Sequence, residues 1–232
     1  MSGKQRVSLE PGYILNARPY TDSSLLIEAL TRAHGRVGLV ARGARSAKSK
    51  LRGVLQPLAP LLLSWAESGE LGTLTGAESD GAPLPLAGDR VFYAWYVNEL
   101  VLKLLERRDP HEQLYDAYAH ALGQLAGAQA EVALRLFEKA LLQETGYGLP
   151  LPDEPEAALH YRFDPQHGAV PAAPGGGTVA GASLIALRDE QFDTPQALAD
   201  ARKILRAAIA HQLNGRELET PKLLRELSAL TE

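Results

Sequence analysis

The sequence contains no cysteine. Disulfide bonds, thiol catalysis and Cys-ligated zinc or iron–sulfur sites are therefore excluded. Long apolar runs are also missing, because charges interrupt the longest ones well before the roughly 20 residues that a membrane helix needs. The N-terminal stretch lacks the apolar core of a signal peptide. We therefore expect a soluble protein of the reducing cytoplasm.

Negative charge predominates, but not everywhere. The 232 residues carry a formal net charge of −4, whereas residues 32–52 hold seven Arg and Lys and no Asp or Glu. The rest of the chain has 17 Lys and Arg and 28 Asp and Glu, which is a formal net charge of −11. Such a local excess indicates contact with a polyanion. The alternative is a solvated loop that only keeps the protein soluble.

The first 80 residues predict strands. One segment, RVGLVAR at 36–42, places Val37, Leu39 and Ala41 on one face and the other residues on the opposite face. This period of two is typical of a half-buried strand. Short strands separated by turn residues over this length predict a small barrel or sandwich. The expected strands are 7–20, 24–31, 36–42, 58–65 and 71–77.

The pattern changes to helical after residue 85. The clearest helix is 130–145, whose apolar residues form one stripe and whose end is marked by Gly146. Residues 146–181 contain seven Gly and six Pro and predict a loop-rich segment with a weak hairpin at 159–170. We expect two domains, 1–82 and 83–232, and an α+β fold. The other expected helices are 92–106, 111–125, 198–213 and 221–230.

The basic run begins on the predicted strand 36–42 and continues into a loop rich in Gly, Ser and Ala. A small barrel with a cationic face and a basic loop is typical of proteins that hold single-stranded nucleic acid. Aromatic platforms for base stacking are few: Tyr13, Tyr20 and Trp65 are the only aromatic residues of the first 80, and Trp65 fits a core position equally well. We therefore expect binding that is mainly electrostatic and weakly sequence-selective.

Enzymatic signatures are missing. The stretch GARSAKSK has the Lys and Ser of a phosphate loop but lacks the second Gly and, by its pattern, a following helix. The six histidines include no HExxH; His160 and His167 flank the predicted hairpin without a third ligand. No nucleophile motif or catalytic triad is apparent. We expect neither catalysis nor a cofactor nor a bound metal.

Four stretches resemble the RecO family of bacterial recombination mediators. The most specific is GRVGLVARGARSAKSKLRGVLQPLAPLLLSW at 35–65. ILNARPYTDSSLLIEALT at 14–31 is similar to the family's opening, and YVNELVLKLLE at 96–106 and ALRLFEKALLQETGYGLPL at 133–151 are similar to its helical region. The resemblance runs through about residue 151 and weakens in the last third.

This resemblance implies an N-terminal OB fold and a mostly helical C-terminal domain. It also implies a protein, associated with the nucleoid, that binds single- and double-stranded DNA and anneals complementary strands. RecO-like proteins act with RecR, and often RecF, to load RecA onto DNA coated by single-stranded-DNA-binding protein (SSB), without nucleotide hydrolysis. The residues that the resemblance assigns to DNA contact are Arg36, Arg42, Arg45, Lys48, Lys50 and Arg52, with Arg18 a weaker assignment.

SSB proteins end in an acidic, hydrophobic tail, so their receptor needs a cation beside an apolar pocket. The resemblance assigns this role to Arg135, with Lys139 one turn further along the helix. The alternative for Arg135 is a surface ion pair with Glu131 or Glu138.

Many RecO-like proteins bind zinc through four cysteines after the segment equivalent to 146–151, and this chain has none there. No zinc site is therefore carried over, and the loop must be held by packing or be mobile.

Charge alone leaves other functions open. An RNA-binding or ribosome-associated OB-fold protein would present the same cations, because phosphates of RNA and DNA attract lysine equally. A pure interaction scaffold would leave the cation cluster without a role. Strand annealing separates these possibilities, since only a mediator is expected to accelerate it.

Overall fold

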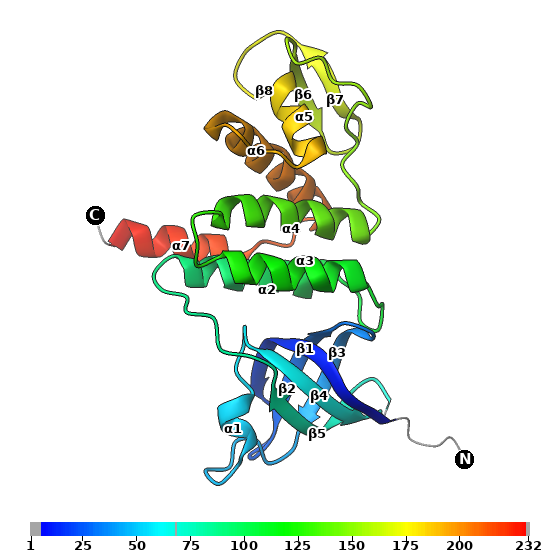
Figure 1. The fold of residues 1–232 in the computed structure, drawn as a ribbon, viewed down its shortest axis with the longest axis vertical. Helices are drawn as coiled ribbons and strands as arrows, with labels where there is room; N and C mark the ends of the chain where they lie inside the picture. The colour runs from blue at the N-terminus through cyan, green and yellow to red at the C-terminus, as the bar shows by residue number, and fades with distance from the viewer. Residues whose placement is uncertain (1–5, 68, 231–232) are drawn as a thin grey trace.

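The computed structural model describes residues 6–67 and 69–230. Residues 1–5, 68 and 231–232, which fall within the predicted domains, lie outside the described part. Figure 1 shows three tiers: a β-barrel, a layer of helices, and a small sheet with two further helices. The barrel strands are β1 (Arg6–Pro19), β2 (Leu25–Thr31), β3 (Gly35–Ala41), β4 (Pro60–Ala66) and β5 (Gly72–Ser79). The strands of the small sheet are β6 (His160–Asp164), β7 (Gly168–Ala172) and β8 (Thr178–Ala180). The helices are α1 (Leu51–Val54), α2 (Arg90–Leu104), α3 (Glu112–Gln124), α4 (Ala130–Glu144), α5 (Gly181–Asp189), α6 (Pro195–Gln212) and α7 (Glu219–Leu230).

The five N-terminal strands close into a barrel with the order β1-β2-β3-β5-β4. All neighbouring pairs are antiparallel except β3 and β5, which pair in parallel through Leu39↔Gly72 and Val40↔Thr73. The long strand β1 pairs with both β2 and β4, and its register shifts let it curve around the barrel. This is an OB fold followed by a helical region, so the predicted α+β class is confirmed.

Alternate residues of the strands fill the barrel. Val37, Leu39 and Ala41 of β3 all face the interior, as the period of two predicted. Trp65 lies in the same core and is 2% exposed, so it is a core residue and not a stacking platform.

One strand serves two cores. Ile14 of β1 points into the barrel, while its neighbours Tyr13 and Leu15 pack with the helical domain. The ring of Tyr13 lies 5.1 Å from that of Tyr118 on α3, and the ring of Tyr118 lies 6.2 Å from that of Phe137 on α4. These aromatic contacts tie the barrel to the middle tier of Figure 1.

The third tier contains the segment that was expected to be mainly loop. The predicted hairpin is present as β6 and β7, and β8 extends it to three strands, which the sequence did not predict. Packing holds this sheet to the helices, since Tyr161 and Val179 are buried in the helical core. His160 and His167 lie at opposite ends of the hairpin and do not meet.

Helix α5 was also missed, because Gly and Pro dominate the sequence that leads into it. Gly181, its first residue, packs directly on the preceding loop: a Cβ placed there would lie 1.9 Å from the carbonyl oxygen of Glu156. Glycine at this position therefore permits close packing and does not end an element.

A buried hydrogen-bond pair crosses the junction between barrel and helices. Asn98 on α2 donates from Nδ2 to the carbonyl oxygen of Leu15 at 2.9 Å. Its Oδ1 accepts from the hydroxyl of Tyr118 at 2.6 Å. Because all three residues are buried, each group depends on the others for its hydrogen bond.

We therefore predict that Asn98→Ala destabilises the protein. The Leu15 carbonyl and the Tyr118 hydroxyl lose their partners, at a cost of about 1–3 kcal/mol for each buried group. Urea unfolding of Asn98→Ala measures this loss. Asn16→Ala, at an exposed position on β1, is the control and is expected to change stability by less than about 0.5 kcal/mol. Equal stability of the two variants would contradict the role of Asn98.

Candidate nucleic-acid interface

The cations that follow β3 occupy a structured loop. Residues 42–52, here called the basic loop, form consecutive turns that lead into the one-turn helix α1, which the sequence did not predict. Ala44 and Leu55 are buried in the barrel core and hold the loop at both ends. Cationic side chains project from it into solvent. The exposed cations are Arg42, Arg45, Lys48, Lys50 and Arg52.

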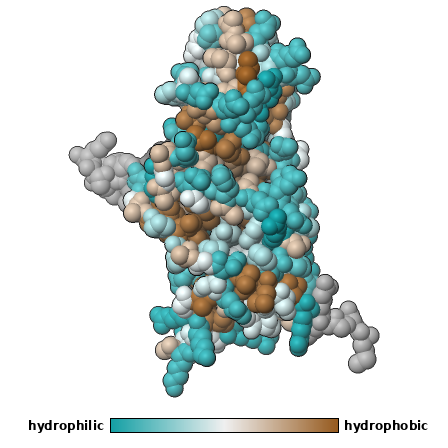
Figure 2. Space-filling view, in the orientation of Figure 1, coloured by the Kyte–Doolittle hydropathy of each residue, from teal (hydrophilic) through white to brown (hydrophobic). Residues whose placement is uncertain are grey.

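These five side chains lack an acidic partner among the side chains that the structure describes. No ion pair joins any of them to an Asp or Glu of residues 6–67 and 69–224, although other Arg and Lys residues of the chain are paired. Figure 2 shows hydrophilic side chains projecting from the end of the barrel where Figure 1 places α1. The basic loop is therefore a concentrated and unneutralised positive surface.

Arg45 also has a structural role. Its Nη1 donates to the carbonyl oxygens of Thr21 at 2.8 Å and Asp22 at 3.1 Å, and its backbone N–H donates to the carbonyl oxygen of Ser23 at 3.0 Å. These bonds join the basic loop to the turn between β1 and β2. Replacing Arg45 would therefore remove a charge and release this turn at the same time.

Arg18 lies on the same side of the barrel as the start of the loop. The strand register aligns Arg18 of β1 with Leu26 of β2, Leu26 with Val40 of β3, and Val40 with Thr73 of β5. Directly paired residues point to the same face of a sheet. Arg18 therefore belongs to the outer face that continues into Arg42.

Arg36 is separated from these cations. It lies at the junction with the helical domain, where its Nη1 donates to the carbonyl oxygen of Leu102 at 3.2 Å and lies 3.6 Å from Glu28. Burial lowers the pKa of Arg36; Glu28 acts in the opposite direction and Arg107 in the same one. Arg107 also pairs with Glu28. The structure therefore places Arg36 in an interdomain ion-pair cluster, apart from the basic loop.

Arg135 on α4 is buried and paired. Its Nη2 lies 3.0 Å from Oε1 of Glu138, which also accepts a hydrogen bond from the hydroxyl of Tyr96 at 2.6 Å. Burial raises the pKa of Glu138, and Arg135 and Tyr96 oppose that shift. Of the two acids considered for a surface ion pair, Glu138 is the partner, but the pair is buried. Glu131 bonds to Arg202 on α6 instead.

Lys139 is also engaged. Its Nζ lies 2.7 Å from Oε1 of Glu190 and donates to the carbonyl oxygen of Arg188 at 2.9 Å. Arg135 and Lys139 on α4 and Arg202 on α6 are thus three cations that each have an acidic partner.

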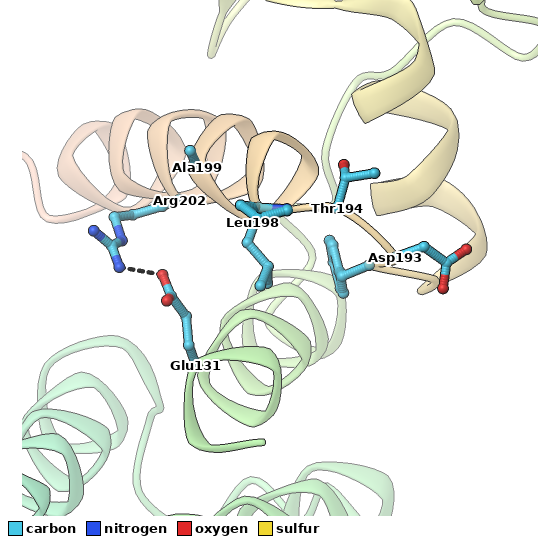
Figure 3. Close-up of a pocket in the computed structure, with 8 residues that line it drawn as sticks. Glu131, Asp193, Thr194, Leu198, Ala199 and Arg202 are labelled. Atoms are coloured by element: carbon cyan, nitrogen blue, oxygen red, sulfur yellow. Dashed lines mark hydrogen bonds and ion pairs between the residues drawn. The ribbon is translucent and has the colours of Figure 1, made fainter. Parts of the chain in front are cut away.

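A pocket that the sequence did not reveal lies between α4 and α6 (Figure 3). Leu198, Ala199 and Arg202 line it from α6, and Glu131 lines it from α4. Its volume is about 430 Å³. Thr194 begins α6 at this point, because its Oγ1 accepts from the N–H of Ala197 at 3.1 Å. In the sequence, the pocket is signalled only by an apolar residue, Leu198, and a cation, Arg202, that stand four residues apart and therefore on one face of the predicted helix. The remaining lining residues are Phe192, Asp193, Thr194 and Pro195.

In the described part of the chain, His, Asp and Glu side chains form no group of three or more that could hold a metal ion. None of the described helices is both long and apolar enough to cross a bilayer.

Known families cover nearly all of the chain. The model described as "Recombination protein O N terminal" matches residues 6–81, and "Recombination protein O C terminal" matches residues 86–221. The DNA repair protein RecO of Methylococcus capsulatus is 43% identical, with 96% of this chain and 95% of that protein aligned. RecO of Thiobacillus denitrificans is 43% identical over 99% of this chain and 96% of its own length. RecO of Dechloromonas aromatica is 40% identical over 99% of this chain and 100% of its own length. The chain therefore belongs to the RecO family of DNA repair proteins.

Proposed function

We propose that this protein is a DNA-binding recombination mediator that acts by binding and not by bond chemistry. In this proposal it binds single- and double-stranded DNA and anneals complementary strands on the nucleoid in the cytoplasm. The observation that carries the proposal is the set of exposed cations of the basic loop, which pair with no described acidic side chain, on an otherwise acidic protein. Family membership favours DNA over RNA as the polyanion.

Electrostatics explains how such a loop would promote annealing. Two complementary strands repel each other through their phosphates, and cations that replace condensed counterions reduce this repulsion while gaining entropy from ion release. Five neutralised phosphates of a single strand give a slope of log K against log salt of about −3.5. Affinity would then fall on the order of a hundredfold between about 50 and 200 mM salt.

Arg36 contributes differently in this scheme. Because it is bonded to Leu102 and Glu28 at the domain junction, we assign it to positioning the barrel against the helices. Arg18 extends the DNA path along the outer face, beyond Arg42.

The mediator role adds protein partners. We propose that the protein acts with RecR, and indirectly with RecF and RecA, on DNA coated by SSB. The acidic, hydrophobic SSB tail would bind along α4 and α6, with its apolar residues on Leu198 and its carboxylates on Lys139 and Arg202. The tail would replace the acidic partners Glu190 and Glu131, while buried Arg135 holds α4 in place through Glu138.

The basic loop is tested by the triple variant Lys48→Glu, Lys50→Glu and Arg52→Glu, which leaves the structural Arg45 intact. We expect single-stranded DNA affinity at 50 mM salt to fall at least about tenfold. The salt slope should become shallower by about 0.7 for each lost phosphate contact. Fluorescence anisotropy of a labelled oligonucleotide measures both quantities, and an annealing assay with two complementary strands tests the consequence.

The matched control reverses the same number of charges elsewhere. Arg162, Arg206 and Lys222 are exposed on the helical domain, and their replacement by Glu gives the same net charge. If both triple variants bind DNA equally, the effect is one of total charge and the basic loop is not the site. If the wild-type protein binds DNA without accelerating annealing, the mediator proposal fails.

The SSB contact is tested with a labelled peptide carrying an acidic, hydrophobic SSB tail. We expect Arg202→Ala and Lys139→Ala each to weaken binding by about three- to fivefold, because each removes one charge-assisted contact of modest strength. Arg162→Ala, on the outer side of β6, is the control and should bind as the wild type. Unchanged affinity in both test variants would exclude the groove between α4 and α6 as the site.

A further inference from the structure

An open pocket lies on the barrel beside the basic loop. Its volume is about 460 Å³, within the range of small-molecule sites. Val40 and Thr73, which pair across β3 and β5, line it, and so does Arg42 at the start of the basic loop. The residues that line it are Tyr20, Thr21, Ser23, Ser24, Val40, Arg42, Leu71 and Thr73.

Tyr20 gives the pocket an accessible aromatic ring. It is 54% exposed, whereas Tyr13 and Trp65, the other aromatic residues of the described barrel, are buried in the two cores. Base stacking needs a ring with an accessible face. Within the described barrel, Tyr20 alone meets this requirement.

The wall that carries Tyr20 is held in place. The N–H of Tyr20 donates to the carbonyl oxygen of Ser24 at 3.1 Å, and the N–H of Ser24 donates to Oγ1 of Thr21 at 3.2 Å. From the other side, Arg45 bonds to the carbonyl oxygens of Thr21 and Asp22. The basic loop and the Tyr20 turn therefore form one ordered unit, which lowers the entropic cost of binding a ligand between them.

The chemistry of the lining suits one nucleotide. The Tyr20 ring and Val40 offer apolar surface to the flat face of a base. Hydroxyl groups of Ser23 and Thr73 are donors and acceptors for polar atoms at a base edge. Arg42 supplies a guanidinium for the adjoining phosphate. An acidic side chain, which would repel that phosphate, is not among the lining residues.

We propose that this pocket, here called the Tyr20 pocket, binds one unpaired base of single-stranded nucleic acid, stacked on Tyr20, while Arg42 contacts its phosphate. The inference rests on the proposed DNA-binding function and deepens it. A base inside a duplex is stacked and paired, so it cannot enter the pocket without being extruded. The pocket therefore gives the protein a preference for single strands that the basic loop, which recognises only phosphates, does not supply.

The test combines removal of the ring with removal of the base. Wild-type protein, Tyr20→Ala and Tyr20→Phe are titrated with a labelled oligo-dT and with an abasic strand of the same length and charge. On oligo-dT we expect Tyr20→Ala to bind about 5- to 150-fold more weakly and Tyr20→Phe to bind as the wild type. On the abasic strand, all three proteins should bind equally. Duplex affinity and the salt slope should not change, because no charge is altered.

Tyr147→Ala is the control, since Tyr147 is exposed to a similar degree on the helical domain. Thermal melting tests whether Tyr20→Ala is folded. If that variant does not fold, the wild-type protein alone tests the proposal: equal affinity for oligo-dT and for the abasic strand would overturn the base pocket.

The outcomes also separate this inference from the proposed function. If Tyr20→Ala binds oligo-dT like the wild type while charge reversal in the basic loop abolishes binding, the pocket is wrong and the DNA-binding function stands. If the wild-type protein does not bind DNA even at low salt, both proposals fail. Loss of affinity that is equal on oligo-dT and the abasic strand would assign Tyr20 to backbone contact and overturn base stacking.

Discussion

The architecture depends on β1 being shared between two hydrophobic cores. Side chains of a strand alternate between its faces, so Ile14 enters the barrel while Tyr13 and Leu15 enter the helical core. Burying each such apolar side chain is worth about 1.5–3 kcal/mol. Separating the two domains would expose the second face of β1 and orphan the hydrogen bonds of Asn98. The barrel is therefore fixed relative to the helices.

This fixed junction divides the outer face of β3 into two regions. At one end, Arg36 is bonded to the helical domain and the side chain of Arg107 lies over Gly38, where a Cβ would come within 3.1 Å of the Arg107 guanidinium carbon. At the other end, Val40 and Arg42 remain open and line the Tyr20 pocket. At the covered end Arg36 and Arg107 both pair with Glu28, whereas the cations beyond the open end have no acidic partner among the described side chains.

The helical domain uses charge in a different way. Arg135, Lys139 and Arg202 all have acidic partners, and the Arg135–Glu138 pair is buried with Tyr96. In the proposed tail site, an acidic peptide would replace the carboxylates that these cations already contact, so specificity would come mainly from the apolar neighbours. In the third tier, packing of Tyr161 and Val179 into the helical core holds the small sheet to the helices.

The sequence by itself determined the local elements and the position of the charge. Periodicity located the five barrel strands and most helices within a few residues, because one buried face imposes a period of two or 3.6 on the chain. The basic run at 32–52 was evident because its seven cations without an acid are recognised in the sequence before any folding is considered. The sequence did not predict α1, β8 and α5, because these elements are short or lie beside Gly and Pro, which obscure the hydrophobic periodicity. Tertiary structure decided which cations are accessible: Arg36 is partly buried and paired, Arg135 is buried and paired, and Arg42 is exposed beside Tyr20. Partners brought together from distant parts of the chain, such as Leu102 for Arg36 or Thr73 for Val40, leave no local pattern in a single sequence.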